Sequence, residues 1–180
     1  MKQSLRFVSL LLLLLVQFSC SHKVTGEVSA LPPIIITGQQ SEKYNMQLDF
    51  RKHHFSGMLI VRQMPSDEIR ILGATYFGLS LFDFSLTDRV MKVNSCIEPM
   101  KKKRILQLLE RDFKNLFLSG EKARIQTKSS TFEQRTSGSG FLKSVFLLSE
   151  FVGGQAEQVQ IKHPLIGLTI QLNKLNDNDF

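Results

Sequence analysis

We predict an α+β fold in which one amphipathic helix covers a meander of antiparallel strands. Apolar and polar side chains alternate over several short stretches separated by tight turns, which is typical of half-buried antiparallel strands. After Pro99 the apolar spacing changes to three and four residues, which is typical of a helix with one apolar face. The sheet is the only large apolar surface that this helix can cover.

The strands begin where Tyr44, Met46, Leu48 and Phe50 alternate with polar residues. Residues 64–67 (Met-Pro-Ser-Asp) have the composition of a hairpin turn. The predicted strands of this first part are 44–51, 55–63, 68–77, 79–86 and 89–95. The isoleucine triplet at 34–36 either belongs to a tether or forms an edge strand.

The helix is predicted to start at Glu98-Pro99 and to end before Ser119-Gly120. Strands follow at 122–128 and 131–136, around 159–161 and at 166–172, whereas 142–151 fits a strand or a helix. The loop at 137–140 (Ser-Gly-Ser-Gly) lacks the strand-to-helix context of a nucleophile elbow or a phosphate-binding loop.

The first twenty residues resemble a bacterial lipoprotein signal. Lys2 and Arg6 precede an apolar run of about a dozen residues, which is shorter than the roughly twenty of a membrane-spanning helix. Ser19 and Cys20 end this run as in a lipobox. The resemblance implies that residues 1–19 are removed and that Cys20 carries a lipid.

The second cysteine, Cys96, is then left without a partner, so we expect core packing to hold the fold. Gln17 stands where a lipobox has an aliphatic residue, three positions before Cys20. Cleavage after Ser21 therefore stays an alternative, and so does a Cys20–Cys96 disulfide.

The remaining length fits one domain. We expect the lipidated cysteine and a tether at 20–40, a single β-rich domain at 41–175 and a polar tail at 176–180. The formal net charge of the chain is +7, much of it in the basic run of Lys101, Lys102, Lys103 and Arg104. Because positive charge at a helix start opposes the helix dipole, this run is a candidate contact for anionic lipid headgroups, with a solvated helix start as the alternative. An exported protein rarely meets nucleic acid, so we expect no such partner.

No catalytic or metal-binding spacing is present in the sequence. The histidines at 22, 53, 54 and 163 form no ligand motif, so we expect them to be solvated. Cys96 has no histidine beside it in sequence, and Asp83 is expected to point outward from its strand. We therefore expect neither an enzyme nor a bound metal or cofactor.

The stretches 55–63 and 79–86 carry apolar residues on both faces. A sheet covered by one helix needs only one apolar face. The second face indicates either a larger core or a cavity for a hydrophobic ligand. The candidate cavity residues are Leu59, Leu79, Leu81, Phe82, Phe84 and Phe113.

Two segments resemble the LolA/LolB-like group of envelope proteins: 55–63 (FSGMLIVRQ) and 77–84 (FGLSLFDF). The chain is also similar to uncharacterised lipoproteins of Bacteroidetes-type bacteria, and the resemblance covers about residues 44–118. It implies a strongly curved, half-open antiparallel β-barrel, LolB-like, with a cavity that accepts acyl chains. The exposed leucine loop of the lipoprotein receptor has no clear counterpart, and Met64-Pro65 is the nearest candidate.

The expected function is a lipid-anchored envelope protein that binds an acyl chain, a lipoprotein or another hydrophobic ligand in this half-barrel. Residues 21 and 22 (Ser-His) lack the acidic signal for inner-membrane retention, so we expect the outer membrane and the periplasmic side. The alternative is a non-enzymatic scaffolding lipoprotein that packs against a protein partner.

Overall fold

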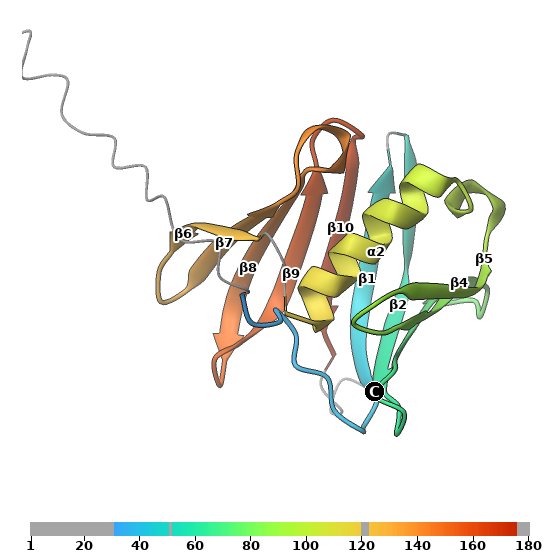
Figure 1. Ribbon diagram of the computed structural model, residues 1–180, viewed down its shortest axis with the longest axis horizontal. Coiled ribbons are helices and arrows are strands. Elements are labelled where there is room, and N and C mark those ends of the chain that lie inside the picture. Colours follow the sequence, from blue (N-terminus) through green and yellow to red (C-terminus); the bar gives the residue numbers. More distant parts are fainter. Residues whose placement is uncertain (1–30, 51, 120–122, 176–180) are drawn as a thin grey trace, which may run out of the picture.

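The computed structural model describes residues 31–50, 52–119 and 123–175. The predicted signal, Cys20 and the tail at 176–180 lie outside the described residues. The described part forms one ten-stranded antiparallel sheet, and helix α2 (Lys103–Phe117) lies across one face of it (Figure 1). We call this face the inner face and the opposite one the outer face.

The sheet brings the two ends of the domain together at its centre. β1 pairs with β10 from Tyr44↔Lys174 to Phe50↔Leu168, and the order is β5-β4-β3-β2-β1-β10-β9-β8-β7-β6. The strands are β1 (Glu42–Phe50), β2 (His53–Gln63), β3 (Ile69–Thr75), β4 (Ser80–Leu86), β5 (Met91–Cys96), β6 (Arg124–Lys128), β7 (Phe132–Ser137), β8 (Ser144–Val152), β9 (Gln155–His163) and β10 (Leu168–Lys174).

The α+β half-barrel prediction is wrong. About 55% of the described residues are in strands and 15% are helical, and the sheet does not close, so the fold is closer to all-β. The ambiguous stretch 142–151 forms most of β8 instead of a helix. Pro99 lies in a short 3-10 turn (Glu98–Met100), and α2 starts only at Lys103 with 15 residues. The helix is therefore too small a part of the domain to define its class.

The core lies between α2 and the inner face of the sheet. The helix buries Leu108, Leu109, Phe113, Leu116 and Phe117. The Phe113 ring contacts those of Phe82 and Phe84, with a centroid distance of 6.0 Å to each. Burying each of these side chains stabilises the fold by about 1.5–3 kcal/mol. Apolar residues at alternate positions of the strands face the helix, as the sequence predicts.

A glycine on β3 makes room for one of these rings. A Cβ atom at Gly73 would lie 2.4 Å from the Phe82 ring, which is far inside van der Waals contact. Phe82 packs directly over the Gly73 backbone, so the position of this ring depends on the missing side chain.

The end of the predicted tether packs on the domain. Ile34 and Ile35 are buried, and the Ile35 amide donates a hydrogen bond of 2.8 Å to the carbonyl of Leu116 near the end of α2. Arg135 Nη1 donates a hydrogen bond of 2.6 Å to the carbonyl of Pro32. The triplet thus forms neither a strand nor a free tether. The boundaries proposed for the domain stay a prediction.

Candidate functional site: an apolar groove at one edge of the sheet

The turns of the sheet alternate between its two edges because the neighbouring strands are antiparallel. The connection from β5 to α2 therefore lies at the same ends of the strands as four of the turns: β1–β2, β3–β4, β7–β8 and β9–β10. We call this the groove edge. In Figure 1 it includes the start of α2.

An apolar groove of about 100 Å³ opens here between the start of α2 and the sheet. All of its lining residues are apolar: Leu48, Phe50, Phe55, Leu81, Phe82, Ile97, Pro99, Met100, Ile105, Leu109 and Leu168. A deeper gap of about 10 Å³ beneath the helix shares Leu48, Phe82, Met100 and Leu109 with this groove. The gap is about as large as one water requires, so apolar side chains fill nearly all of the space between the helix and the sheet below the groove.

The structure brings together five of the six predicted cavity residues. Leu81 and Phe82 line the groove, and Leu59, Phe82 and Phe113 line the deeper gap. Phe84 is fully buried and stacks on Phe82 at a centroid distance of 4.9 Å. Leu79 lies apart from this cluster and is 69% exposed.

Sequence reasoning missed the helix side of the groove. Ile105 and Leu109 lie in the first half of α2, at positions that helical periodicity assigns to the covered face, and Met100 lies in the 3-10 turn before the helix. It also missed Leu48 and Leu168, because the pairing that places β10 beside β1 is not visible in local patterns.

The basic run is flanked in the chain by two residues that line the groove. Lys101, Lys102, Lys103 and Arg104 are exposed and lie between two lining residues, Met100 and Ile105. Helix α2 has no side-chain cap at its start and no acidic residue in its first turn. The helix dipole and the cations therefore add to one positive region. A hydrogen bond to Glu98 raises the pKa of Lys101, so this cation stays charged at neutral pH.

Exposed apolar residues lie in the turns of the same edge. Phe77 in the β3–β4 turn is 97% exposed, Phe141 before β8 is 65% exposed and Leu165 in the β9–β10 turn is 64% exposed. The sequence analysis named Met64-Pro65 as the nearest counterpart of the receptor's exposed leucine loop. Met64 is 36% exposed and lies in the β2–β3 turn at the opposite edge. Phe77 was not considered because it belonged to a predicted strand.

A buried polar cluster fixes α2 to the sheet. Ser144 Oγ donates a hydrogen bond of 2.6 Å to Asp112 Oδ1, and His163 Nε2 lies 2.9 Å from Asp112 Oδ2. Ser144 Oγ is 3.4 Å from His163 Nδ1. The three residue types recur in hydrolases, but here the serine donates to the aspartate and all three are fully covered. This arrangement anchors the helix and presents no nucleophile to a substrate.

His163 is therefore not solvated, contrary to the sequence prediction, since it is only 1% exposed. His54 is exposed and lies 2.5 Å from Asp49. Asp83 points outward as expected and pairs with Arg70 at 2.6 Å. Over the described ranges, no group of three or more His, Cys, Asp or Glu residues could hold a metal ion.

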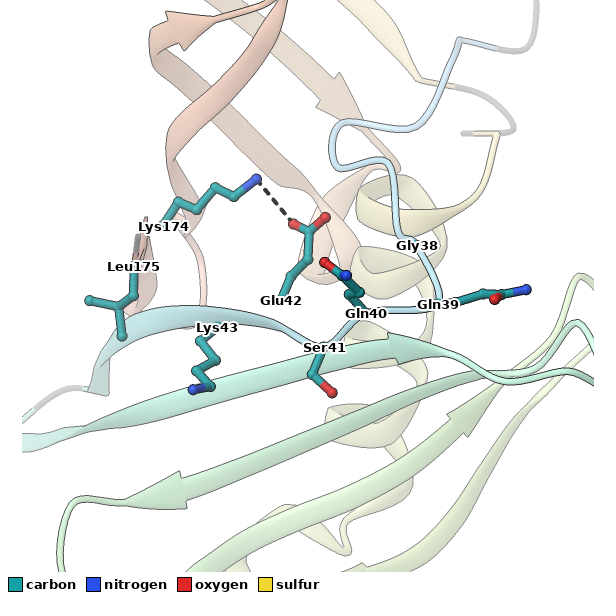
Figure 2. A pocket seen from close by; sticks show the side chains of 8 residues that line it. All are labelled: Gly38, Gln39, Gln40, Ser41, Glu42, Lys43, Lys174 and Leu175. Atoms are coloured by element: carbon teal, nitrogen blue, oxygen red, sulfur yellow. Dashed lines mark ion pairs between the residues drawn. The ribbon is translucent and has the colours of Figure 1, made fainter. Parts of the chain in front are cut away.

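A polar pocket of about 480 Å³ lies at the opposite edge of the sheet. Figure 2 shows its lining, with Lys174 directed toward Glu42. The Lys174 Nζ atom is 3.3 Å from Glu42 Oε2, and the Tyr44 hydroxyl donates to the same carboxylate. Burial, followed by the charge of Glu42, raises the pKa of Tyr44, so its hydroxyl stays protonated. The lining includes Ser41 but no histidine or cysteine, so we assign it no catalytic role.

No protein-family model and no curated protein matches this chain. A solved structure of a DUF1329 family protein from Desulfovibrio piger is similar, with a TM-score of 0.35 and 10% identity over 79% of this chain and 88% of that one. This similarity is too low to assign a family or a function. Among the described helices, none is long and apolar enough to cross a membrane.

Proposed function

We propose that this chain is a lipid-anchored envelope protein that binds an acyl chain, a lipidated protein or another hydrophobic ligand at the apolar groove. The observation that carries the proposal is an entirely apolar lining with four exposed cations in the chain between two of its residues, Met100 and Ile105. An apolar chain next to an anionic group has the complementary chemistry, so the preferred ligand is an anionic amphiphile.

The size of the groove limits how much of such a ligand it holds. Small-molecule pockets usually enclose about 300–1,000 Å³, whereas this groove has about 100 Å³. That is roughly seven to ten times the cavity volume of about 10–15 Å³ that one water requires, enough for the end of an acyl chain. Burying three or four methylenes contributes about 3 kcal/mol. Each nearby cation adds about 1 kcal/mol toward an anionic surface. Charge contacts are therefore needed for useful affinity.

The proposed location is the periplasmic side of an outer membrane, with the lipid on Cys20. This location rests on the signal-like first twenty residues and on the resemblance to LolB-type lipoproteins. Metabolic labelling with a fatty acid tests the anchor. Wild-type protein should incorporate label and Cys20→Ala should not, and equal labelling would refute it.

Binding is tested by titrating a fluorescent twelve-carbon fatty acid and its methyl ester into the purified domain. We expect saturable binding of the acid, weakened about tenfold or more in Lys102→Glu/Lys103→Glu, because two favourable charge contacts become repulsive. The ester should bind both proteins equally. Lys92→Glu, an exposed lysine on β5, is the matched control and should not change the affinity. The absence of saturable binding would refute the proposal.

A scaffolding role is the second candidate, favoured by the filled inner face and by the exposed Phe77. Native mass spectrometry of protein purified without detergent separates the two. A co-purifying lipid supports ligand binding. An empty protein that forms a stable complex, lost in Phe77→Ser, supports scaffolding.

A further inference from the structure

The outer face of the sheet carries two adjacent rows of uncharged side chains, all of them polar except Leu147. Cross-strand pairing aligns Ser149, Gln158, Asn173 and Asn45 in one row, and Gln134, Leu147, Gln160, Gln171 and Gln47 in the next. Their neighbours along each strand, such as Val159 and Leu172, are buried in the core, so these side chains point away from α2. We call the two rows the amide face. It crosses β7, β8, β9, β10 and β1, which lie side by side in Figure 1.

Part of the amide face is hollowed. A pocket of about 260 Å³ is lined by Phe132, Leu147, Ser149, Gln158, Val159, Gln160, Gln171 and Asn173. The Ser149 hydroxyl donates a hydrogen bond of 2.8 Å to Gln158 Oε1, which orients that amide. The Asn173 Oδ1 atom is buried and has no hydrogen-bond partner among the described residues.

Both rows lack charge, although 22% of the chain is charged. Exposed antiparallel strands commonly use opposite charges as cross-strand pairs. Here the charged residues stand in the flanking rows, with Lys162 and Asp49 on one side and Lys43 on the other. A charged ligand would find no counter-ion within the rows. Amide side chains donate and accept, so they suit a neutral ligand that is dense in hydroxyl or amide groups.

Apolar contacts are available beside these amides. Phe132 and Leu147 form one end of the hollow, where the apolar face of a sugar ring could pack. At the far side the Tyr76 hydroxyl donates a hydrogen bond of 2.8 Å to Asn45. From β7 to β1 the face spans four strand spacings, about 19 Å, which is long enough for an oligosaccharide.

We propose that the amide face binds a neutral polysaccharide chain laid across β7 to β1. This site is independent of the apolar groove, because it lies on the opposite face of the sheet and uses hydrogen bonds instead of apolar burial.

The test is titration of chitohexaose and maltohexaose, two neutral probes, monitored by calorimetry and by amide chemical shifts. We expect at least one probe to bind saturably, with shift changes confined to β7, β8, β9, β10 and β1. Gln160→Ala and Gln171→Ala should each weaken binding about five- to tenfold, the effect of losing one or two hydrogen bonds. Gln107→Ala, an exposed amide on α2, is the matched control and should leave the affinity unchanged. Circular dichroism checks that each variant is folded.

Three outcomes would overturn the proposal. One is no saturable binding of either probe at millimolar concentration, and another is an equal effect of the Gln107 control. The third is a dimer in light scattering that Gln160→Lys dissociates, because the amide face would then be an interface between two copies. Titration of the wild-type protein alone shows whether either probe binds, so this test does not depend on the folding of a variant.

Discussion

Replacing Asp112 by alanine should destabilise the domain more than any surface change, because this carboxylate has two buried partners. Ser144 donates to it at 2.6 Å and His163 lies 2.9 Å from it, with all three covered. Removing one partner of a buried pair typically costs about 3–5 kcal/mol. In the variant the Ser144 hydroxyl can turn to His163 Nδ1, 3.4 Å away, and recover part of this loss. We therefore expect the free energy of unfolding to fall by about 3 kcal/mol.

Urea denaturation followed by circular dichroism measures this change. With a slope of about 1.5 kcal/mol per molar urea, the midpoint should fall by about 2 M at an unchanged slope. A double-mutant cycle with Ser144→Ala should give a coupling energy of about 0.5–3 kcal/mol. Ser85→Ala is the matched control, since this buried serine lies on β4 and bonds to Arg70 and Asn94. It should be additive with Asp112→Ala. A loss below about 1 kcal/mol would mean that the cluster does not anchor the helix.

Three further predictions concern other parts of the domain. Gly73→Ala should destabilise it by about 1–3 kcal/mol in urea denaturation, because the new methyl group displaces the Phe82 ring; an unchanged midpoint would contradict this packing. Burial opposes ionisation of Glu133, but hydrogen bonds and charge from Arg135 and Lys128 outweigh it and hold the pKa of this carboxyl below its ordinary 4.5. A depressed pKa gives stability that is present above 4.5 and is lost as the pH falls through the folded-state pKa, so Glu133→Gln should flatten the loss of stability below that pH. An equally steep loss in this variant would point to other carboxylates. Phe77→Ser should leave the unfolding midpoint unchanged, because this ring is 97% exposed, and a clear loss would show that it packs on the domain.

Local patterns were sufficient to predict the elements but not their arrangement. The helix face with Leu109 and Phe113 follows from three- and four-residue spacing. The strands β1 and β10 follow from the alternation of apolar and polar residues. The central β1–β10 pairing joins residues more than a hundred positions apart, so no turn motif in the sequence indicates it. The predicted fold class was wrong because the strands after α2 extend the same ten-stranded sheet, so the helix is only a small part of the domain.

The polar residues of the interior were missed for a related reason. Asp112 and Asn115 are polar residues on the covered side of α2, and the partners of Asp112 come from β8 and β9. The sequence treated His163 as a turn residue next to Pro164, because only the pairing of β9 with β8 and the placement of α2 bury it. Burial of a polar side chain depends on tertiary partners, and these lie outside any local window.

The same strands present two different chemistries, because successive residues of a strand point to opposite faces. On β10, Leu168 lines the apolar groove while Gln171, three residues on, belongs to the amide face. On β1, Leu48 and Gln47 divide in the same way. An acyl chain at the groove and a polysaccharide on the outer face would therefore not compete for space. The sheet between them is hydrogen-bonded strand to strand from β7 to β1. Substitutions on the amide face should therefore leave the apolar groove unchanged, and substitutions in the groove should leave the amide face unchanged.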